Sequence, residues 1–403
     1  MPDIHRMTAI PHLMDVYRRL EVSFTHGEGV WVWDEQQRRH LDGVAGIGVL
    51  ALGHAHPAVT ATIQRQAGRL LHVSNMYRIR EQEHLAERLC ALSGMDAAFF
   101  SNSGAEANEA AIKLARLHGQ HLGIAAPQVV VMQGAFHGRT LAALAATGNQ
   151  KLQQGFAPLP EGFVRVPYDD PSAVEQLASQ RQDIAAILVE PIQGEGGVRL
   201  PAPDYLARLR QLCNRQGWLL MIDEVQTGLG RTGRWFAHQH DPGVLPDVIT
   251  LAKALGNGLP IGATLARGGA ATLFTPGSHG STFGGNPFVC AVASTVLETM
   301  RQVLPEVEAR GAFLQDNLHR QLGGMGCNHA IRGQGLMLGI TLHDADASRL
   351  ADLPRIALDH QVLLNVTAGT VVRLLPPLIL QQQEAVLLAE RVAGAIAHCL
   401  GRP

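Results

Sequence analysis

The chain has 403 residues, which is more than one hydrophobic core usually serves, so about two packed units are expected. Its 33 Lys and Arg residues nearly balance its 35 Asp and Glu residues, and the net charge of −2 offers no basic excess for binding nucleic acid. The absence of an apolar run of about 18 residues, of an apolar signal sequence and of any CxxC pair among the scattered cysteines favours a cytoplasmic protein with reduced thiols.

The N-terminal part of the chain is expected to form an irregular arm that contains one β-hairpin. Residues 28–43 (EGVWVWDEQQRRHLDG) place apolar residues on both sides of a polar turn, which predicts the hairpin. The next stretch, 53–72 (GHAHPAVTATIQRQAGRLLH), contains the start of a helix.

Short apolar runs alternate with amphipathic stretches from about residue 85 to about residue 290. The apolar runs are continuous, as expected for strands of a parallel sheet that helices cover on both faces. This pattern predicts an α/β fold with right-handed crossovers. The expected strands are 97–101, 128–132, 185–192, 218–225 and 247–253, and the clearest helices are 106–119 and 205–217.

A smaller α+β unit is expected in the last part of the chain. A helix over 287–304 leads into it, strand-like runs follow at 332–342 and 371–378, and an amphipathic helix ends it. We therefore predict an N-terminal arm that contributes to the small domain, a large ligand-binding domain and a C-terminal small domain. Their predicted bounds are 1–55, 56–295 and 296–403.

Residues 101–108 (SNSGAEAN) join an expected strand to an expected helix. Ser103 and Glu106 have the spacing of a capping box. Gly104 and Ala105 carry little or no side chain, so their N–H groups can face a ligand. Free N–H groups at a helix N-terminus bind phosphate through hydrogen bonds and the helix dipole. The stretch therefore predicts a phosphate site, although an ordinary capped helix shows the same pattern.

Two charged residues stand at the ends of apolar strands. Asp223 ends the most apolar one, at the edge where ligands of open α/β sheets bind, and it suits a cationic group such as a pyridinium nitrogen. Lys253 follows the next strand, where burial lowers the pKa of an amine and frees it for Schiff-base chemistry and proton transfer. Taken singly, Asp223 can also be a turn cap and Lys253 a surface lysine with a buried stem.

Other groups suit the anionic parts of a ligand. The turn 280–287 (GSTFGGNP) combines glycines with the hydroxyls of Ser281 and Thr282, which can donate to phosphate. Arg139 follows an apolar strand in FHGR, and Arg373 lies in VVRLLPP. Arginine binds carboxylates through a bidentate fork, so two such arginines suit a pair of substrates that both carry a carboxylate.

Eight stretches that cover nearly the whole chain resemble, in their order, the class III aminotransferases. That family consists of fold-type I enzymes that use pyridoxal 5′-phosphate (PLP). The resemblance implies a large PLP-binding domain, with a mostly parallel seven-stranded sheet flanked by helices, a smaller α+β domain and an obligate homodimer. The stretches are GHAHP, SNSGAEANEAAIKLAR, AFHGRT, VEPIQGEGGV, DEVQTGLGRTG, LAKALGNGLPIGA, GSTFGGNP and RLLPPL.

The same resemblance implies roles at the cofactor. The catalytic Lys253 would hold PLP as a Schiff base, and Asp223 would pair with the pyridine nitrogen. Phe136 would stack on the ring, Gln226 would sit near the ring hydroxyl, and Thr282 would reach the phosphate in the neighbouring subunit. The expected cofactor-binding residues are Ser103, Gly104, Ala105, Phe136, Asp223, Val225, Gln226, Lys253 and Thr282.

Roles at the substrate follow from the resemblance as well. Arg139 and Ser281 would contact the substrate, and Arg373 would bind the α-carboxylate of glutamate or 2-oxoglutarate. Glu195 would act as a switch that covers Arg373 for one substrate and swings away for the other. Within the family the chain looks most like the enzymes of arginine biosynthesis that transfer an amino group from N2-acetyl-L-ornithine to 2-oxoglutarate. The small apolar residues of 43–49 suit an acylated amine; succinylornithine, ornithine and 4-aminobutyrate are the alternative donors.

Three readings from other classes are disfavoured by the sequence. Residues 228–233 spell G-x-G-x-x-G, but the next stretch lacks the helical period that a dinucleotide-binding dehydrogenase requires. The paired histidines 54/56 and 238/240 have no third ligand at matching spacing, so no metal site is expected. A non-catalytic scaffold would be expected to have lost Lys253. Racemases, aminomutases and decarboxylases of the same family remain alternatives, which the paired Glu195 and Arg373 make less favoured.

Overall fold

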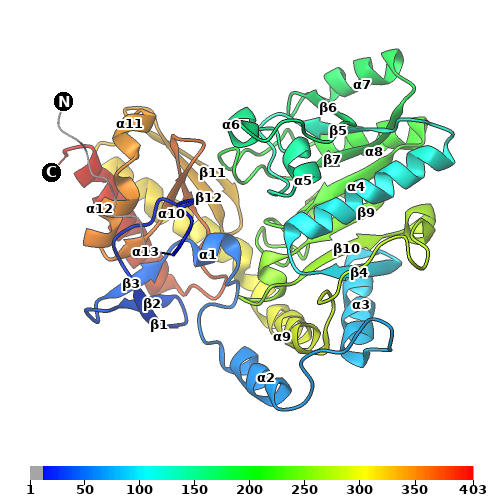
Figure 1. Ribbon diagram of the computed structural model, residues 1–403. Helices are drawn as coiled ribbons and strands as arrows, with labels where there is room; N and C mark the ends of the chain where they lie inside the picture. Colours follow the sequence, from blue (N-terminus) through cyan, green and yellow to red (C-terminus); the bar gives the residue numbers. More distant parts are fainter. Residues whose placement is uncertain (1–11, 403) are drawn as a thin grey trace.

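The computed structural model of the protein describes residues 12–402. Its centre is a seven-stranded sheet in the order β4-β10-β9-β8-β7-β5-β6. In this sheet β10 runs in the direction opposite to the other six strands. The mostly parallel α/β sheet expected from the sequence is therefore confirmed (Figure 1). The strands are β4 (Ala97–Ser101), β5 (Gln128–Met132), β6 (Phe163–Val166), β7 (Ile184–Val189), β8 (Leu219–Asp223), β9 (Val248–Leu251) and β10 (Gly262–Ala266).

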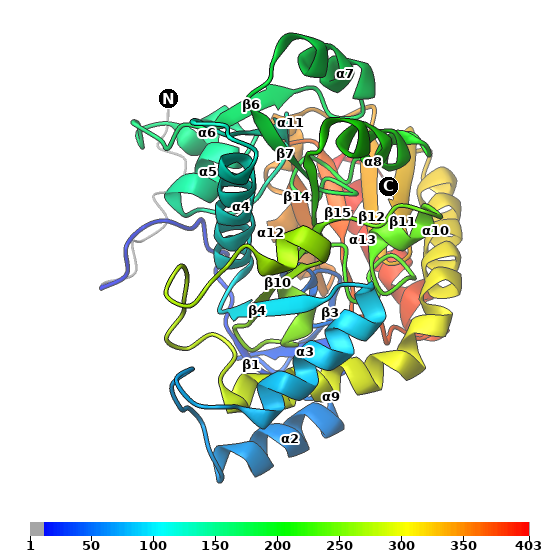
Figure 2. The same ribbon diagram turned by 90° about the vertical axis from the view of Figure 1, so that its right-hand side faces the viewer.

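Helices cover both faces of this sheet. Val130 and Met132 of β5 pack in the same apolar cluster as α8 (Tyr205–Gln216), whereas Val129 and Val131 pack with α4 (Gly104–His121). Successive side chains of a strand point to opposite faces, so a strand buried on both faces must be apolar at every position. Figure 2 shows α4 and α8 on opposite sides of β7, in which every residue is buried.

Two smaller sheets lie beside the large one. The expected hairpin forms from β2 (Trp31–Asp34) and β3 (Arg39–Asp42), and β3 pairs in parallel with β13 (Val362–Leu363) of the distant C-terminal part. The three-segment division stays a prediction, and α9 (Pro287–Val303) runs across residue 295 without a break. The other strands are β1 (Phe24–Glu28), β11 (His329–Gln334), β12 (Met337–Leu342), β14 (Asn365–Thr367) and β15 (Val371–Leu374).

Most remaining helices pack around these sheets. Among the described residues, no helix is long and apolar enough to cross a membrane. The longer helices have clear ends: α3 ends at Gly94 in the left-handed conformation, and the Asn286 side chain caps α9. The remaining α-helices are α2 (Pro57–Ala67), α3 (Arg80–Ser93), α5 (Leu141–Ala146), α6 (Gln150–Gln153), α7 (Pro171–Gln180), α10 (Val307–Gly324), α11 (Ala347–Leu350), α12 (Leu353–Asp359) and α13 (Gln382–Cys399).

The short element α1 (Ala45–Gly48) has an unusual backbone. Its four residues have φ of 49°, 63°, 67° and 74°, and the two that are not glycine, Ala45 and Ile47, are strained by this left-handed conformation. The buried carboxylate of Asp42 holds the start of the turn, because Oδ1 accepts the N–H groups of Val44 at 2.9 Å and Ala45 at 2.7 Å. Strain of this kind persists where surrounding contacts enforce it, often at functional sites.

Candidate active site

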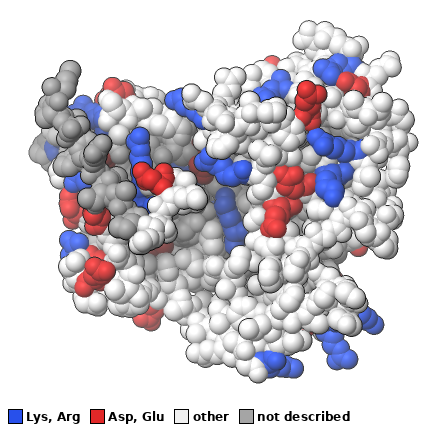
Figure 3. All heavy atoms as spheres, viewed as in Figure 1, with Lys and Arg blue, Asp and Glu red and all other residues white. Residues whose placement is uncertain are grey.

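The carboxyl ends of five parallel strands meet at one edge of the large sheet, around a cavity of about 440 Å³. Figure 3 shows a hollow near the middle of this face, with basic side chains in and beside it. Ligands of open α/β sheets bind at this edge. Ten of the site residues predicted from the sequence line the cavity. They are Ser103, Gly104, Ala105, Phe136, Arg139, Glu195, Asp223, Val225, Gln226 and Lys253.

The N-terminus of α4 forms one end of the cavity. Ser103 caps the helix, and its Oγ accepts the N–H of Glu106 at 3.2 Å. The expected capping box is altered, because the Glu106 carboxylate accepts the N–H of Asn102 at 2.8 Å. The first N–H groups of a helix have no partner within it, so those of Gly104 and Ala105 are available to an anion. A Cβ on Gly104 would lie 2.7 Å from Val225 Cγ1, so this position requires glycine.

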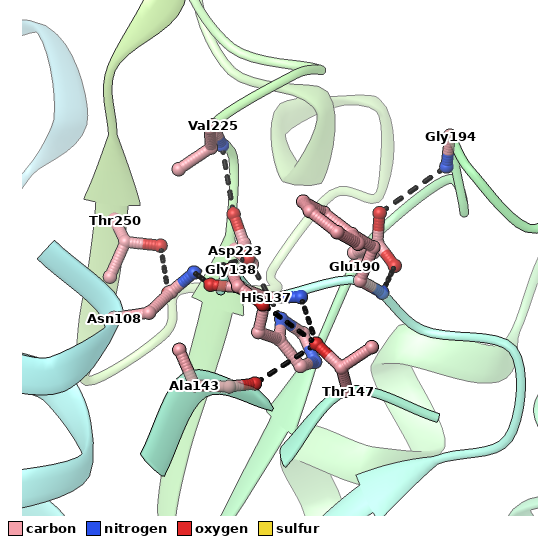
Figure 4. Close-up of polar contacts among 11 residues, drawn as sticks. Asn108, His137, Gly138, Ala143, Thr147, Glu190, Gly194, Asp223, Val225 and Thr250 are labelled. Carbon is pink, nitrogen blue, oxygen red and sulfur yellow. Dashed lines mark hydrogen bonds and ion pairs between the residues drawn. The ribbon is translucent and has the colours of Figure 1, made fainter. Parts of the chain in front are cut away.

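Asp223 occupies the floor of the cavity and is fixed from three sides (Figure 4). Its Oδ2 accepts the Nδ2 group of Asn108 at 2.7 Å and Nδ1–H of His137 at 2.8 Å, and its Oδ1 accepts the N–H of Val225 at 3.0 Å. Thr250 in turn donates to Oδ1 of Asn108 at 2.8 Å. These donors fix the orientation of the carboxylate.

Lys253 begins a single 3-10 turn (Lys253–Leu255) directly after β9, with a positive φ of 42°. The pKa of its amine is lowered from 10.5 to about 8, mainly by burial; the charges of Glu195 and Asp223 oppose this shift, and the nearby guanidinium of Arg373 adds to it. A lysine with such a pKa is partly unprotonated near neutral pH, so it can act as a nucleophile and as a proton carrier.

A buried ion pair closes another side of the cavity. Nη1 of Arg373 lies 2.5 Å from Oε1 of Glu195, and it also donates to Oε1 of Gln226 at 3.3 Å. Arg373 is completely buried, whereas Glu195 is partly exposed. Nη2 of Arg373 has no hydrogen-bond partner among the described residues. The buried guanidinium can therefore bind the carboxylate of a substrate when Glu195 moves away.

The remaining predicted residues lie at the rim or outside the cavity. Arg139 is exposed, and its guanidinium carbon lies 5.7 Å from the centre of the Phe136 ring. Ser281 does not line the cavity, but its Oγ accepts from Asn102 at 3.2 Å. Thr282 is exposed on the surface of its own chain and does not line this cavity. The roles of Arg139, Ser281 and Thr282 stay predictions.

Comparison with known proteins decides the family. The family model described as "Aminotransferase class-III" matches residues 14–396. The chain belongs to the class III aminotransferases. It is 52% identical over 391 residues to an acetylornithine aminotransferase of Nitrosomonas europaea, with 96% of this chain and 98% of the relative covered.

Solved structures agree with this family. An ornithine aminotransferase from Toxoplasma gondii ME49 superposes with a TM-score of 0.90 at 33% identity, over 97% of this chain and 93% of the other. An N-acetylornithine aminotransferase from Stenotrophomonas maltophilia K279a has a TM-score of 0.84 at 35% identity, over 96% of this chain and 98% of the other.

Class III aminotransferases depend on PLP, and the cavity of this member fits that cofactor. The free N–H groups at the start of α4 suit a phosphate. The carboxylate of Asp223 suits a protonated pyridine nitrogen, the amine of Lys253 suits an aldehyde carbon, and the Phe136 ring suits an aromatic face. The donor set therefore matches each chemical part of PLP.

The glycine pattern at 228–233 has a structural role in this class III aminotransferase. No helix opens at these glycines, as expected; the segment is a series of turns in which Gly230 and Gly233 have φ of 93° and 96°. The buried Arg231 donates from Nη1 to the carbonyls of Leu336 at 3.0 Å and Pro376 at 2.6 Å. The turns therefore connect the large sheet to the C-terminal part of the chain.

In each of the two histidine pairs, one histidine has a carboxylate partner. His54 contacts Asp42 at 2.8 Å, and His238 contacts Glu224 at 3.0 Å. Among residues 12–402, no group of three or more His, Cys, Asp or Glu side chains is arranged to hold a metal ion.

Three buried polar residues of the site had no role assigned from the sequence: Asn108, His137 and Glu190. Each carried a weak signal. Asn108 is a polar residue on the buried, alanine-rich side of α4, and Glu190 directly follows a completely apolar strand. His137 stands between the predicted site residues Phe136 and Arg139. A polar residue that is buried needs a partner, but the partner itself could not be read from the sequence.

Proposed function

We propose that this enzyme transfers the terminal amino group of N2-acetyl-L-ornithine to 2-oxoglutarate, giving N-acetyl-L-glutamate 5-semialdehyde and L-glutamate, a step of arginine biosynthesis. The observation that carries the proposal is the Glu195–Arg373 pair at the cavity, because transamination must accept two different substrates in turn. The names of the relatives at 52% identity support the choice of donor.

PLP would supply an electron sink for the negative charge that develops when a carbon next to nitrogen loses its proton. The residues of the chain transfer the proton and position the cofactor. Nζ of Lys253 takes the proton from the substrate carbon and returns it to a different carbon, as general base and then as general acid. Asn108 and His137 donate to the carboxylate of Asp223 and so hold it where it would pair with the pyridine nitrogen. Phe136 would cover one face of the ring and exclude water from it.

Glu195 and Arg373 adapt the site to its two substrates. With the acylated donor, the Glu195 carboxylate stays on Arg373, so the buried guanidinium remains neutralised. With glutamate or 2-oxoglutarate, the α-carboxylate of the substrate replaces that of Glu195 on Arg373. The partial exposure of Glu195 supports this movement, since its side chain can turn into solvent.

The wall next to the strained turn favours an acylated amine. Val49 lines the cavity directly after α1, and Leu259, Pro260 and Ile261 line it as well. An apolar wall does not stabilise a second ammonium group, whereas it tolerates a neutral amide. Ornithine and 4-aminobutyrate are therefore the weaker alternatives, and succinylornithine is the alternative that keeps an acyl group.

We also propose a homodimer in which Thr282 completes the site of the partner subunit. The exposed turn that carries Thr282 contacts the segment before α3, because Asn75 donates to the carbonyls of Ser281 and Gly284 at 3.1 Å. Several large apolar side chains of these two segments are exposed, which is typical of an interface. They are Leu70, Leu71, Met76, Tyr77 and Phe283. The expected cytoplasmic location stays a prediction.

The proposed function is tested by comparing donors with 2-oxoglutarate as acceptor and measuring glutamate formation. The expected kcat/KM is highest with N-acetylornithine and lower with succinylornithine, ornithine and 4-aminobutyrate. A higher value with ornithine or 4-aminobutyrate would keep the family and overturn the donor. Identification of the semialdehyde product by mass spectrometry is the control for the position of the transferred amine.

A further inference from the structure

A second buried carboxylate, besides Asp223, lies in the cavity and has no role in the chemistry described above. Glu190 directly follows β7, and its side chain is buried. Its Oε2 accepts the N–H of Phe136 at 2.9 Å, and its Oε1 accepts the N–H of Gly194 at 3.2 Å (Figure 4). One side chain therefore joins the loop after β5 to the turn after β7.

These two segments carry different parts of the site. The loop after β5 carries Phe136, which forms a wall of the cavity. The turn after β7 places Glu195 against Arg373. A Cβ on Gly194 would collide with the Gln226 side chain, so the turn packs tightly against the residue that also contacts Arg373. A shift of this turn would therefore move Glu195 relative to Arg373.

The two contacts require a carboxylate. Each oxygen of Glu190 accepts one N–H, whereas a glutamine in its place would have one accepting oxygen and would turn an NH₂ group toward the other N–H. A buried charge is costly unless it is hydrogen-bonded, so these two bonds are what makes the ionised form tolerable here. Protonation would likewise remove one of the two acceptors.

We propose that Glu190 is a positioning residue whose carboxylate holds the loop of Phe136 and the turn of Glu195 in one arrangement. It thereby fixes the position of the Phe136 ring at the cavity and the position of Glu195 against Arg373 at the same time. The proposal rests on the proposed function, because the roles of Phe136 and Glu195 come from it. Glu190 itself need not touch the substrate, since it acts through two backbone N–H groups.

The charge state of Glu190 gives the proposal a pH dependence. Its pKa is raised from 4.5 to about 7, mainly by burial; the charge of Asp223 contributes to this rise, whereas His137 and the two N–H donors oppose it. Above about pH 7 the carboxylate holds both segments, and below it one contact is lost. The titratable and charged groups facing Glu190 are Tyr168, His137, Asp223 and Lys253.

The test is the visible circular dichroism of the holoenzyme, which reports how the bound cofactor is held, measured from about pH 6 to about pH 8.5. The wild type is expected to show a change with its midpoint near the pKa of about 7. Glu190→Gln should lack this change and bind PLP more weakly. Its half-reactions with glutamate and with N-acetylornithine should both slow by about tenfold or more, because small displacements at a reacting centre have large effects on rate.

A matched control separates positioning from general loss of stability. Val174→Ala removes buried apolar atoms from α7, a helix of which no residue lines the cavity. It should lower the melting temperature but keep the pH-dependent dichroism and both half-reaction rates. If Glu190→Gln behaves like Val174→Ala, Glu190 has only a structural role and the proposal is wrong.

A second variant covers the case in which Glu190→Gln does not fold. Glu190→Asp keeps the charge on a shorter side chain that cannot reach both N–H groups. It should slow both half-reactions, and a loss confined to one of them would overturn the claim that the two segments are set together. The dichroism and the glutamate half-reaction do not depend on the donor, so they remain informative even if N-acetylornithine is the wrong donor.

Discussion

Arg373 and Glu195 form an ion pair with an N–O distance of 2.5 Å, although the two residues are 178 positions apart in the sequence. The guanidinium is completely buried and the carboxylate is not. The pair therefore has one fixed member and one member that can leave, which is the arrangement that a site for two successive substrates requires.

Replacing Arg373 by alanine should separate the two half-reactions. The variant lacks the partner for the α-carboxylate, so the half-reaction with glutamate should slow on the order of 100-fold, as expected when one member of a buried charge pair is removed. The half-reaction with N-acetylornithine should change much less. Rapid mixing with each amino donor alone measures both rates. Equal losses in the two half-reactions would contradict the role of Arg373.

The lowered pKa of Lys253 predicts how the apoenzyme captures PLP. The unprotonated amine attacks the aldehyde, and its pKa is lowered by burial to about 8, so the capture rate should rise as the pH increases through about 8 and then level off. An ordinary lysine would still gain reactivity up to its pKa of 10.5. Stopped-flow absorbance of the bound cofactor measures this rate. A rise that continues beyond pH 9.5 would show that the amine is not desolvated in the apoenzyme.

Lys253 also affects the stability of the apoenzyme. Its folded-state pKa lies below the unfolded value, so the cost of burying the charged amine is complete below about pH 8 and disappears as the pH rises toward 10.5. Lys253→Met apoenzyme should therefore melt at a higher temperature than the wild-type apoenzyme at pH 7, and the difference should shrink at pH 10. A constant difference over this range would point to packing instead of charge.

Asn108 should be needed to keep Asp223 in place. Asn108→Ala leaves the buried carboxylate with one donor fewer, at a cost of about 1–3 kcal/mol, and should weaken PLP binding accordingly. Thr250→Val is the matched control, because Thr250 contacts Asn108 and not the carboxylate. Its effect on the dissociation constant of PLP should be smaller. Equal effects of the two variants would show that Asn108 serves only to fix α4 against the sheet.

The predicted role of Thr282 in the partner subunit can be tested by complementation. A mixed dimer of Thr282→Ala and Lys253→Ala chains should contain one intact site, since its Lys253 comes from one chain and its Thr282 from the other. Mixing the two weakly active variants should therefore restore activity, to as much as about half of the wild-type value per mixed dimer if the sites act independently. If Thr282 serves its own chain, both mixed sites are defective and mixing restores nothing.

The strand ends of the large sheet could be predicted from the sequence because each combines a continuous apolar run with a polar residue directly after it. Asp223 and Lys253 carry this pattern, and the structure places both at the cavity. Glu190 carries the same pattern, but its proposed function depends on two N–H groups. One belongs to Phe136, which is 54 positions away in the sequence, and the other to Gly194, which is 4 positions away. Such contacts arise only from tertiary structure, so the pattern could not assign it a role.

The turn at residues 45–48 illustrates another limit of sequence reasoning. Its glycines permit a left-handed backbone, but Ala45 and Ile47 disfavour it. Asp42 accepts the N–H groups of Val44, directly before the turn, and of Ala45 in it. After the turn, the buried Asn257, which is 205 residues away from Leu52, accepts the N–H of Leu52 at 2.8 Å. Local propensity is overridden here by long-range hydrogen bonds.

The most direct test of the account is the half-reaction of the purified holoenzyme without any keto acid. N-acetylornithine is added, and the visible absorbance of the cofactor bound to Lys253 is followed. We expect rapid loss of this absorbance with N-acetylornithine, slower loss with ornithine or 4-aminobutyrate, and its return when 2-oxoglutarate is added. No loss with N-acetylornithine, together with rapid loss with ornithine or 4-aminobutyrate, would contradict the proposed donor.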